Sequence, residues 1–374
     1  MKMNLKLMIA AGLMATAMNS LGQLSVVPTN IVNLGDRELR FGEPVELPWE
    51  TPETQVAYPN ITPDGLALFF ASDRPGGLGQ RDIWVATRPT LSALWGTPVN
   101  LGAPVNTTAI EDDPFLSADG LSLYFDSTRP GGQGNRDLWV TTRPSHADPF
   151  GAPVNLGPAI NSSAYDATPS VSRDHLTLLF ASARSGNNEI WISTRSSPNE
   201  PWPAAGNLGP PINSANYETT AYLSADGLTL FFFSDRHRPG TGSLWVSRRA
   251  GVASAFGAPS LIKHISDLNP GGADFPMLST DEATLYFNTY VSGRTKLWQS
   301  SITILPQLMA LGINPAGEFQ FELLGREGAT YEIELSPDFN NWTPWLTTNT
   351  STSVLLSDPA PAPDGRRFYR VLSH

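Results

Sequence analysis

The chain has 374 residues, which is enough for one large domain and one small one. Its 32 glycines and 33 prolines interrupt every long helical pattern and are typical of many short strands joined by tight turns. The net charge of −11 provides no basic surface for nucleic acid, and a sequence without cysteine excludes disulfides and thiolate metal sites.

The first 22 residues predict a secretory signal peptide. Lys2 and Lys6 precede an apolar run, 7–18, that is too short to span a membrane, and cleavage after Ala17 or after Gly22 fits equally well. No later segment is apolar enough for a transmembrane helix. We therefore expect a bacterial protein that is secreted or periplasmic, with residues 23–40 as a linker.

Residues 41–302 contain five copies of one pattern. An aspartate recurs at spacings of 55, 55, 52 and 55 residues, and a phenylalanine follows each aspartate six residues later. The aspartates are Asp64, Asp119, Asp174, Asp226 and Asp281, and the tryptophans that follow them are Trp84, Trp139, Trp191, Trp245 and Trp298. Five near-equal copies with shared apolar anchors indicate a repeat array.

Each copy has the pattern of a small antiparallel sheet. "LALFFAS" alternates with the period of a strand, and "DIWVATR" makes a second strand. The glycine-rich stretch between them, "DRPGGLGQR", then forms a hairpin turn, because glycine adopts positive φ without steric cost. One short strand before the aspartate and one at "WGTPVNL" complete the four strands of a propeller blade.

Three kinds of catalytic or cofactor site lack support in the sequence. The G-x-G at residues 77–79 lies between two expected strands and opens no helix, so we exclude a phosphate-binding loop. The five histidines are scattered without the close pairing of a zinc site, and no G-x-S-x-G elbow presents a serine nucleophile.

The repeat resembles a known family. "YPNITPDGLALFFASDRPGGLGQRDIWVATR" is similar to the WD40-like, TolB-type β-propeller repeat of bacterial envelope proteins, and the resemblance covers residues 41–302. Copy three has His175 in place of the glycine, copy four has Ala221 in place of a proline, and copy five lacks the glycine and the loop arginine. The resemblance implies a propeller fold, whereas function belongs to sites and not to folds.

A second motif predicts how many blades the ring contains. "WGTPVNL" and its variants begin eleven residues after each of the first four blade tryptophans, and no copy follows Trp298. The unmatched copy, "FGEPVEL", begins at Phe41. We therefore predict that this N-terminal strand completes the last blade and closes a five-bladed ring. A six-bladed ring is the alternative and needs a blade that the sequence does not show.

The tail, residues 303–374, predicts a small β-sandwich of immunoglobulin or fibronectin type. Its "YEIELSPDFNNW" and "RRFYRVL" resemble a module at the C-termini of large secreted bacterial proteins. Four aromatic residues, Trp342, Trp345, Phe368 and Tyr369, fit the core of so small a module, and a sugar-stacking platform is the alternative.

Arginines in the hairpin loops have acidic neighbours across the turn. We expect ion pairs within each blade between the two sets, and a ring of arginines that binds an anionic ligand is the alternative. The pairs are Arg74 with Asp82, Arg129 with Asp137 and Arg184 with Glu189.

Acidic residues also precede the innermost strand of copies two to five. They are Glu111, Asp112, Asp113, Asp166, Glu218 and Asp274. Because the innermost strands of a propeller begin at one rim of the channel, these side chains can converge there, as a Ca²⁺ site, a grip for sugar hydroxyls or an acid/base pair. Alternatively they accept hydrogen bonds from loop amides and arginines. We expect four of them, Asp112, Asp166, Glu218 and Asp274, to point toward one mouth of the channel and to hold a cation or a polar ligand. These four lie seven or eight residues before the blade aspartate, so they cannot all be equivalent on a regular strand.

Two classes of function fit these patterns. The first is an exported, non-catalytic binding or scaffolding propeller that recognises a polysaccharide, an envelope component or a protein partner. The second is a glycan-active enzyme of the glycoside hydrolase type that uses the carboxylate rim. A deep opening with two carboxyl groups about 5 to 10 Å apart favours the enzyme, and a plugged channel favours the scaffold. No cofactor is required, although Ca²⁺ fits the acidic rim.

Overall fold

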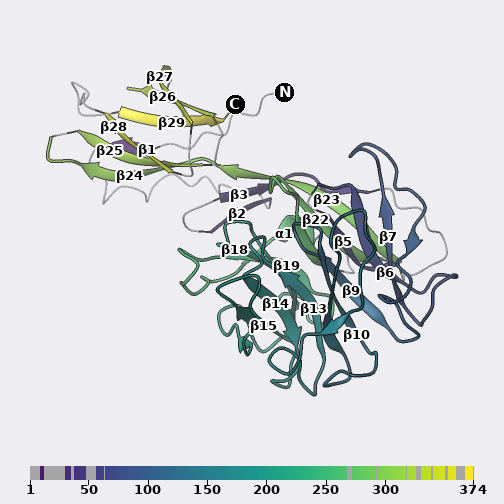
Figure 1. The fold of residues 1–374 in the computed structure, drawn as a ribbon. Helices are drawn as coiled ribbons and strands as arrows, with labels where there is room; N and C mark the ends of the chain where they lie inside the picture. Colours follow the sequence, from purple (N-terminus) through teal and green to yellow (C-terminus); the bar gives the residue numbers. More distant parts are fainter. Residues whose placement is uncertain are drawn as a thin grey trace. The chain divides into compact units, whose positions relative to one another are not determined.

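The computed structural model describes residues 9–11, 30–34, 38–47, 56–62, 64–267, 272–291, 294–316, 318–325, 330–337, 340–349, 353–358 and 367–373. Two compact units make up the chain: Phe41–Ile302, and Met1–Arg40 together with Thr303–His374. Nearly all regular structure in the described residues is β, and the larger unit contains antiparallel sheets of four strands (Figure 1). The predicted fold class is confirmed.

The blades follow one another in the order of the sequence. Blade one contains β5 (Val56–Ile61), β6 (Ala67–Ser72), β7 (Asp82–Thr87) and β8 (Val99–Asn100). Blade two contains β9 (Glu111–Leu116), β10 (Ser122–Ser127), β11 (Asp137–Thr142) and β12 (Val154–Asn155). Blade three contains β13 (Asp166–Val171), β14 (Thr177–Ser182), β15 (Glu189–Thr194) and β16 (Gly206–Asn207). Blade four contains β17 (Glu218–Leu223), β18 (Thr229–Ser234), β19 (Ser243–Arg248) and β20 (Ser260–Leu261).

Blade five is built from both ends of the repeat region. It contains β21 (Ala273–Leu278), β22 (Thr284–Val291), β23 (Arg294–Leu305) and the N-terminal β4 (Val45–Glu46). In the antiparallel pairing of β4 with β23, Glu46 lies opposite Trp298, and the Leu47 amide donates to the Leu297 carbonyl at 2.8 Å. The short helix α1 (Lys263–Ser266) precedes β21 in the sequence. β2 (Ile31–Asn33) and β3 (Glu38–Phe41) pair with each other, with Ile31 opposite Arg40. The N-terminal strand thus closes the ring at five blades, as predicted, and the six-bladed alternative is wrong.

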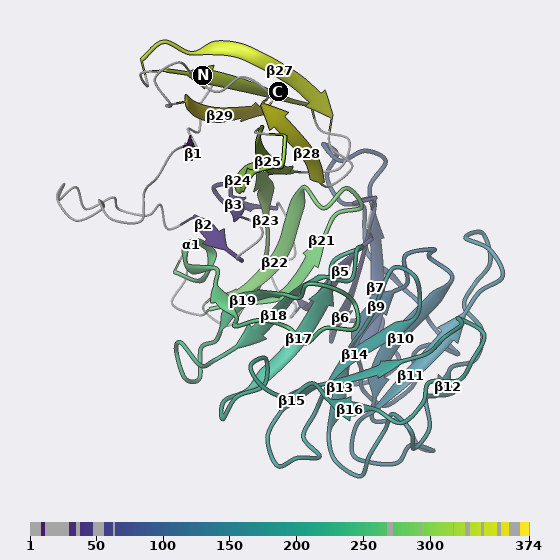
Figure 2. The same cartoon turned by 90° about the vertical axis from the view of Figure 1, so that its left-hand side faces the viewer.

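The first strand of each blade lies innermost. β5 packs beside β9, β9 beside β13, β13 beside β17, β17 beside β21, and β21 again beside β5 (Figure 2). Equivalent phenylalanines fill the space between sheets, and each is at most 1% exposed: Phe70, Phe125, Phe180, Phe232 and Phe287. Burial of these rings, and not intrinsic strand preference, accounts for the strict spacing of the repeat.

The motif aspartates fold the turn that follows each inner strand. In every blade the Oδ1 atom accepts a hydrogen bond from a Ser or Thr hydroxyl two residues earlier and from an amide two residues later; in blade two the donors are Ser117 and Leu121 of the Asp119 turn. These turns define one end of the ring, which we call the turn mouth. The opposite end, where the inner strands begin, we call the start mouth.

A second repeated contact explains the "FG" and "WG" motifs. An arginine at the end of the third strand donates its Nε proton to the turn carbonyl at 2.8 to 2.9 Å and lies over the motif's aromatic ring, 4.0 to 4.7 Å from its centroid. The pairs are Arg88 with Trp95, Arg143 with Phe150, Arg195 with Trp202 and Arg249 with Phe256.

The glycine-rich hairpin in blade one is filled by a carboxylate of the chain itself. The Leu78 amide donates to Asp82 Oδ2 at 2.5 Å, and the Gly79 amide donates to Asp82 Oδ1 at 3.1 Å. Gly76 has a φ of +94°, which suits glycine. The loop therefore turns the chain, and its amides bind an anion that the protein supplies.

The smaller unit is a sandwich of two sheets. One has the order β24 (Gln307–Ile313), β25 (Phe319–Leu324), β28 (Ser353–Asp358). The other has the order β1 (Ile9–Ala11), β29 (Arg367–Ser373), β26 (Thr330–Ser336), β27 (Thr343–Asn349). β1 belongs to the predicted signal peptide, whose remaining residues, 1–8 and 12–22, lie outside the described ones.

Two of the tail aromatics belong to the sandwich core. Tyr369 is 2% exposed and donates to Asp358 Oδ2 at 2.5 Å, and Trp345 packs 5.7 Å from the Phe321 ring. Trp342 and Phe368 are half-buried. The core interpretation therefore holds for Trp345 and Tyr369. None of the helices in the described part of the chain has the length and apolar character needed to cross a membrane.

Candidate functional site

Every inner strand carries a bulge at the same position. Five residues without the freedom of glycine have φ between +45° and +55°: Tyr58, Asp113, Thr168, Thr220 and Phe275. The pairing with the second strand shifts register at each of them, so one residue of the inner strand is left without a partner. Left-handed backbone at residues other than glycine costs free energy and marks positions with a special role.

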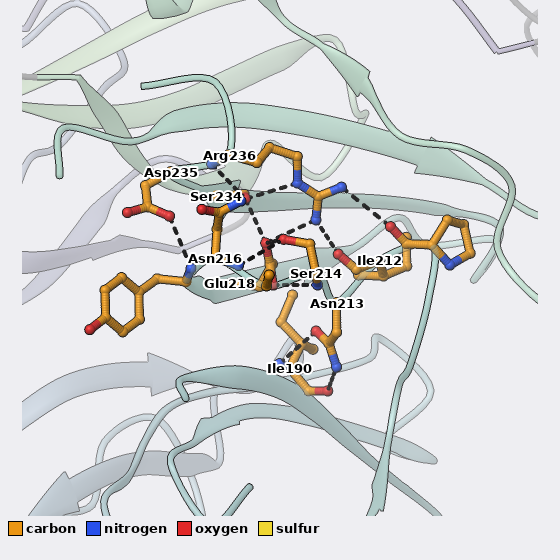
Figure 3. Close-up of polar contacts among 12 residues, drawn as sticks. Ile190, Ile212, Asn213, Ser214, Asn216, Glu218, Ser234, Asp235 and Arg236 are labelled. Atoms are coloured by element: carbon orange, nitrogen blue, oxygen red, sulfur yellow. Dashed lines mark hydrogen bonds and ion pairs between the residues drawn. The ribbon is translucent and has the colours of Figure 1, made fainter. Parts of the chain in front are cut away.

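The first residue of three inner strands is an acid that is balanced inside its own blade. Glu111, Asp166 and Glu218 are each 0% exposed. Glu218 Oε1 accepts from Ser234 Oγ at 2.7 Å and from Arg236 Nη2 at 3.0 Å, and Oε2 accepts from the Ser214 amide at 2.8 Å (Figure 3). Such carboxylates hold the blade together and offer no free oxygen to a ligand.

The same arrangement recurs in the two preceding blades. Arg129 Nη2 lies 3.1 Å from Glu111 Oε1, and Arg184 Nη2 lies 2.6 Å from Asp166 Oδ1. The predicted ion pairs of Arg129 with Asp137 and of Arg184 with Glu189 are therefore wrong. Each arginine extends back along its sheet to the inner strand.

The acids across each hairpin have other partners. Asp137 accepts the amides of Gln133 and Gly134, and Glu189 accepts from Asn207 Nδ2 at 2.7 Å. In blade one, Asp82 accepts hydrogen bonds from the amides of Leu78 and Gly79. The predicted ion pair of Asp82 with Arg74 is therefore also wrong. The register places Val56 opposite Ser72 where blade two has Glu111 opposite Ser127, and Arg74 Nη2 is buried without a hydrogen-bond partner.

The second residue of an inner strand is acidic only in blades two and five. Asp112 and Asp274 occupy equivalent positions, opposite Asp126 and Asn288 respectively. Asp166 and Glu218 are instead the first residues of their strands, so they are not equivalent to Asp112 and Asp274. The hypothesis that Asp112, Asp166, Glu218 and Asp274 hold one ion has no support from these positions, because three of the four, Asp112, Asp166 and Glu218, are bound by arginines. No group of three or more acidic or histidine side chains in the described residues has the geometry of a metal site.

Blade two contains a cluster of charged residues that the other blades lack. Asp112 and Asp126 lie directly opposite each other, and both are 0% exposed. Arg136 Nη1 bridges them, at 2.9 Å from Asp112 Oδ2 and 2.8 Å from Asp126 Oδ2, and Arg81 Nη1 from blade one reaches Asp112 at 2.7 Å. Like charges directly opposite on a sheet repel, so the guanidinium groups are required for this pairing.

Asp113, at the bulge, completes the cluster. It is 3% exposed, and no donor among the described residues reaches its carboxylate oxygens, whose close polar neighbour is the carboxyl group of Asp126. Burial and the neighbouring Asp126 and Asp112 raise its pKa well above the usual value. The rings of Tyr58 and Tyr165 flank the cluster, beneath the guanidinium groups of Arg81 and Arg136. Burial and the same carboxylates raise the pKa of both phenols.

Asp274 lies two blades away and is satisfied locally. Its Oδ1 accepts from Thr220 Oγ1 at 2.6 Å and from the Phe275 amide at 2.7 Å. Burial raises its pKa to about 6, and these two hydrogen bonds lower the pKa by less than burial raises it. Asp274 therefore braces blade five against blade four.

Sequence reasoning found Asp112 and Asp113 and missed Asp126, Arg81, Arg136 and the two tyrosines. A comparison between blades carries the missing signal. At the position of Asp126 the other copies have Ala71, Ala181, Phe233 and Asn288, so a buried acid there departs from the repeat.

The channel between the inner strands is almost filled. A cavity of about 30 Å³ lies at the level of the bulges, lined by Asp113, Thr168, Thr220 and Phe275. The rings of Phe115 and Tyr222 approach to 6.2 Å beside it. This volume corresponds to about one water molecule, so no sugar ring enters the channel.

A much larger cavity, of about 820 Å³, opens at the turn mouth. Turn residues of all five blades line it, among them Asp64, Ala118, Arg173, Ala225 and Glu282. It continues between blades one and two, where its walls are mainly apolar: Phe69, Val85, Val99, Leu101 and Phe150. Its size and mixed lining are those of a ligand site. We call it the turn-mouth cavity.

No protein-family model matches this chain, and no curated protein matches its sequence. The fold is similar to that of a putative TolB from Agrobacterium tumefaciens, at 17% identity and a TM-score of 0.43 over 90% of this chain and 99% of that one. It is also similar to TolB from Acinetobacter baumannii (16%, 0.40, 66% of this chain and 54% of that one) and to an endo-arabinase from Bacteroides thetaiotaomicron (14%, 0.47, 66% and 93%). These likenesses concern the propeller and identify no activity.

Proposed function

We propose that this chain is a non-catalytic binding propeller, exported from a bacterial cell, that recognises a polysaccharide, an envelope component or a protein partner at the turn-mouth cavity. One observation carries the proposal. A cavity of about 820 Å³ with a mainly apolar lining lies at the turn mouth, whereas the buried acids of the start mouth adjoin a channel cavity of about 30 Å³.

The chemistry of the cavity suits recognition. Its acids are engaged in structure: Asp64 and Asp119 hold their turns, and Glu282 accepts the Ala225 amide. Arg173 crosses the opening from blade three and donates to the Thr280 carbonyl of blade five at 3.2 Å. What remains for a ligand is apolar surface with a few polar groups at its edge, which is the usual composition of a binding pocket.

The glycan-active alternative has one observation in its favour. Asp112 and Asp126 share Arg136, so their nearest oxygens lie no more than two hydrogen-bond lengths apart, and a pair of nearby carboxyl groups is what glycoside hydrolysis requires. However, both carboxylates are 0% exposed and bound to arginine. A general acid must reach the glycosidic oxygen, and the oxygens of these two side chains contact the arginines that neutralise them.

Two exposed valines give a matched test. Val99 and Val154 occupy the same outer-strand position in blades one and two, are 62% and 64% exposed, and differ in that Val99 lines the cavity and Val154 does not. We expect Val99→Arg to weaken the binding of any ligand found on glycan and peptide arrays by about tenfold or more, and Val154→Arg to leave it unchanged.

The arrays also decide between the two functions. Each glycan that binds is incubated with the protein, and new reducing ends are measured. Binding that Val99→Arg weakens, without cleavage, supports the proposal. Cleavage that is lost in Asp126→Asn, or binding that both valine variants reduce equally, contradicts it.

A further inference from the structure

One carboxylate in the channel is left unbalanced by the protein. Both oxygens of Asp113 are buried and without a partner, and so is Thr168 Oγ1 on the neighbouring inner strand. Both side chains line the channel cavity, whereas Thr220 Oγ1, on the same lining, is committed to Asp274. A buried carboxylate without a counterion is unstable, so we expect it to bind either a proton or a cation.

The charges around Asp113 do not cancel. Its acidic neighbours are Asp112 and Asp126, and its basic neighbours are Arg81 and Arg136. Three carboxylates and two guanidinium groups leave one negative charge. Two other buried acids nearby are balanced by arginines, Glu111 by Arg129 and Asp166 by Arg184, whereas Asp274 has neutral donors only. One positive charge is therefore missing from the cluster around Asp113.

We propose that the channel cavity binds one small monovalent cation, an alkali ion or ammonium, between the carboxylate of Asp113 and Thr168 Oγ1. The cavity of about 30 Å³ accommodates an ion the size of a water molecule. The deficit around Asp113 is one charge, which a monovalent ion balances and Ca²⁺ exceeds, and the described side chains form no group of three or more metal ligands. Backbone carbonyls and water would complete the shell of the ion. This site is separate from the turn-mouth cavity, and its existence does not depend on the proposed function.

The bulge explains why the site exists. The left-handed conformation at Asp113 and Thr168, with φ of +49° and +52°, takes both residues out of the strand pairing and places them on the channel lining. An ion held there connects blades two and three at the axis. The raised pKa of Asp113 identifies the competing occupant, which is a proton shared with Asp126.

Thermal unfolding in different chloride salts distinguishes the two occupants. At equal ionic strength and about pH 8, where protons compete least, lithium, sodium, potassium and ammonium are compared with choline, which is too large for the cavity. We expect at least one small cation to raise the melting temperature of the full chain by about 3 °C or more relative to choline. Crystals grown in rubidium chloride should show an anomalous peak beside Asp113.

Two variants make the result specific. Asp113→Asn keeps the shape and removes the charge, so it should abolish both the cation dependence and the rubidium peak. Asp274→Asn changes an acid that has its own partners and should keep both. The proposal is overturned if the melting temperature is the same in all the salts, falls as pH rises, and no anomalous peak is found. That result would assign the site to a shared proton.

Discussion

The buried acids of this propeller differ in what balances their charge. Glu111 has an arginine and two hydroxyl groups, Asp274 has a hydroxyl and an amide, and Asp113 has no donor. All three lie among the first three residues of an inner strand, Glu111 and Asp113 on β9 and Asp274 on β21, so the differences arise from the residues around them. The sequence located all three near the start of an inner strand, but it assigned them one role. Charge balance depends on contacts between strands that sequence spacing does not reveal.

Removal of the hairpin arginine should lower the stability of the protein much more in blade two than in blade one. Arg129→Met leaves Glu111 buried without its counterion and should lower the free energy of unfolding by about 3 to 5 kcal/mol. Arg74→Met removes a guanidinium that has no acid partner and retains the packing on Phe70 and Trp84, so we expect a change of about 1 kcal/mol or less. Urea unfolding measures both, and equal losses would contradict the assignment of Glu111 to Arg129.

Asp274 should make stability depend on pH. Because its pKa is raised from 3.8 to about 6 in the native state, the folded protein binds this proton more tightly than the unfolded chain does. Its contribution to the free energy of unfolding is therefore largest below about pH 4, falls as pH rises through 6, and is constant above. Asp274→Asn should flatten this fall.

Melting temperatures at intervals between about pH 4 and 7 test the effect of Asp274. Burial also raises the pKa of Asp112, so the variant should retain part of the slope. An unchanged pH profile in Asp274→Asn would show that this carboxyl titrates normally in the folded protein.

Elements of this fold follow from sequence to different degrees. The second and third strands and the turns between them follow directly from alternation, glycine and proline, and they were predicted correctly. The bulge in the inner strand was not, because Tyr58, Thr168 and Phe275 belong to residue types that rarely adopt positive φ. The sequence does contain a weak signal. A proline follows the bulged residue in blades one, two, three and five, and Ala221 takes its place in blade four. The arginine partners were missed because the hairpin acids are occupied by amides that no side-chain pattern shows.

The hairpin of blade one provides a test at the scale of the element. A Cβ at Gly77 would lie 2.4 Å from Asp82 Oδ2, and Gly76 has a φ that disfavours other residues. Gly77→Ala should displace the carboxylate from the amides of Leu78 and Gly79, and the Gly76→Ala, Gly77→Ala double variant should lose about 1 to 3 kcal/mol of stability.

Denaturant unfolding of the double variant is paired with calorimetric titration of ATP and NAD. We expect no nucleotide binding before or after the substitutions, because Asp82 occupies the amides. Binding to the unchanged protein that disappears in the double variant would instead assign the loop to a phosphate.

The ring as a whole depends on a contact between distant parts of the chain. Lys296 and Glu46 lie 250 residues apart in sequence and form an ion pair at 2.8 Å across β4 and β23. The repeat count predicted this closure because one motif was missing at one end and in excess at the other. The turn-mouth cavity, in contrast, was not predicted, since it arises from the spacing between blades one and two. Contacts of such long range are slow to form in folding, so the last blade is expected to complete late.

Deletion of residues 24–50 should open the ring. It removes β2, β3 and β4 together with four apolar side chains that are at most 6% exposed: Val32, Leu39, Phe41 and Leu47. Their burial contributes about 1.5 to 3 kcal/mol each, and the hydrogen bonds of β23 to β4 are lost with them. We therefore expect the melting temperature to fall by several degrees, and the free edge of β23 to promote association that size-exclusion chromatography detects.

Glu46→Ala is the control. It removes only the exposed ion pair with Lys296 and should cost less than about 1 kcal/mol. If the deletion variant has the melting temperature of the full chain and remains monomeric, β4 contributes nothing to closure. If Glu46→Ala lowers the melting temperature as much as the deletion does, the ion pair and not the strand closes the ring.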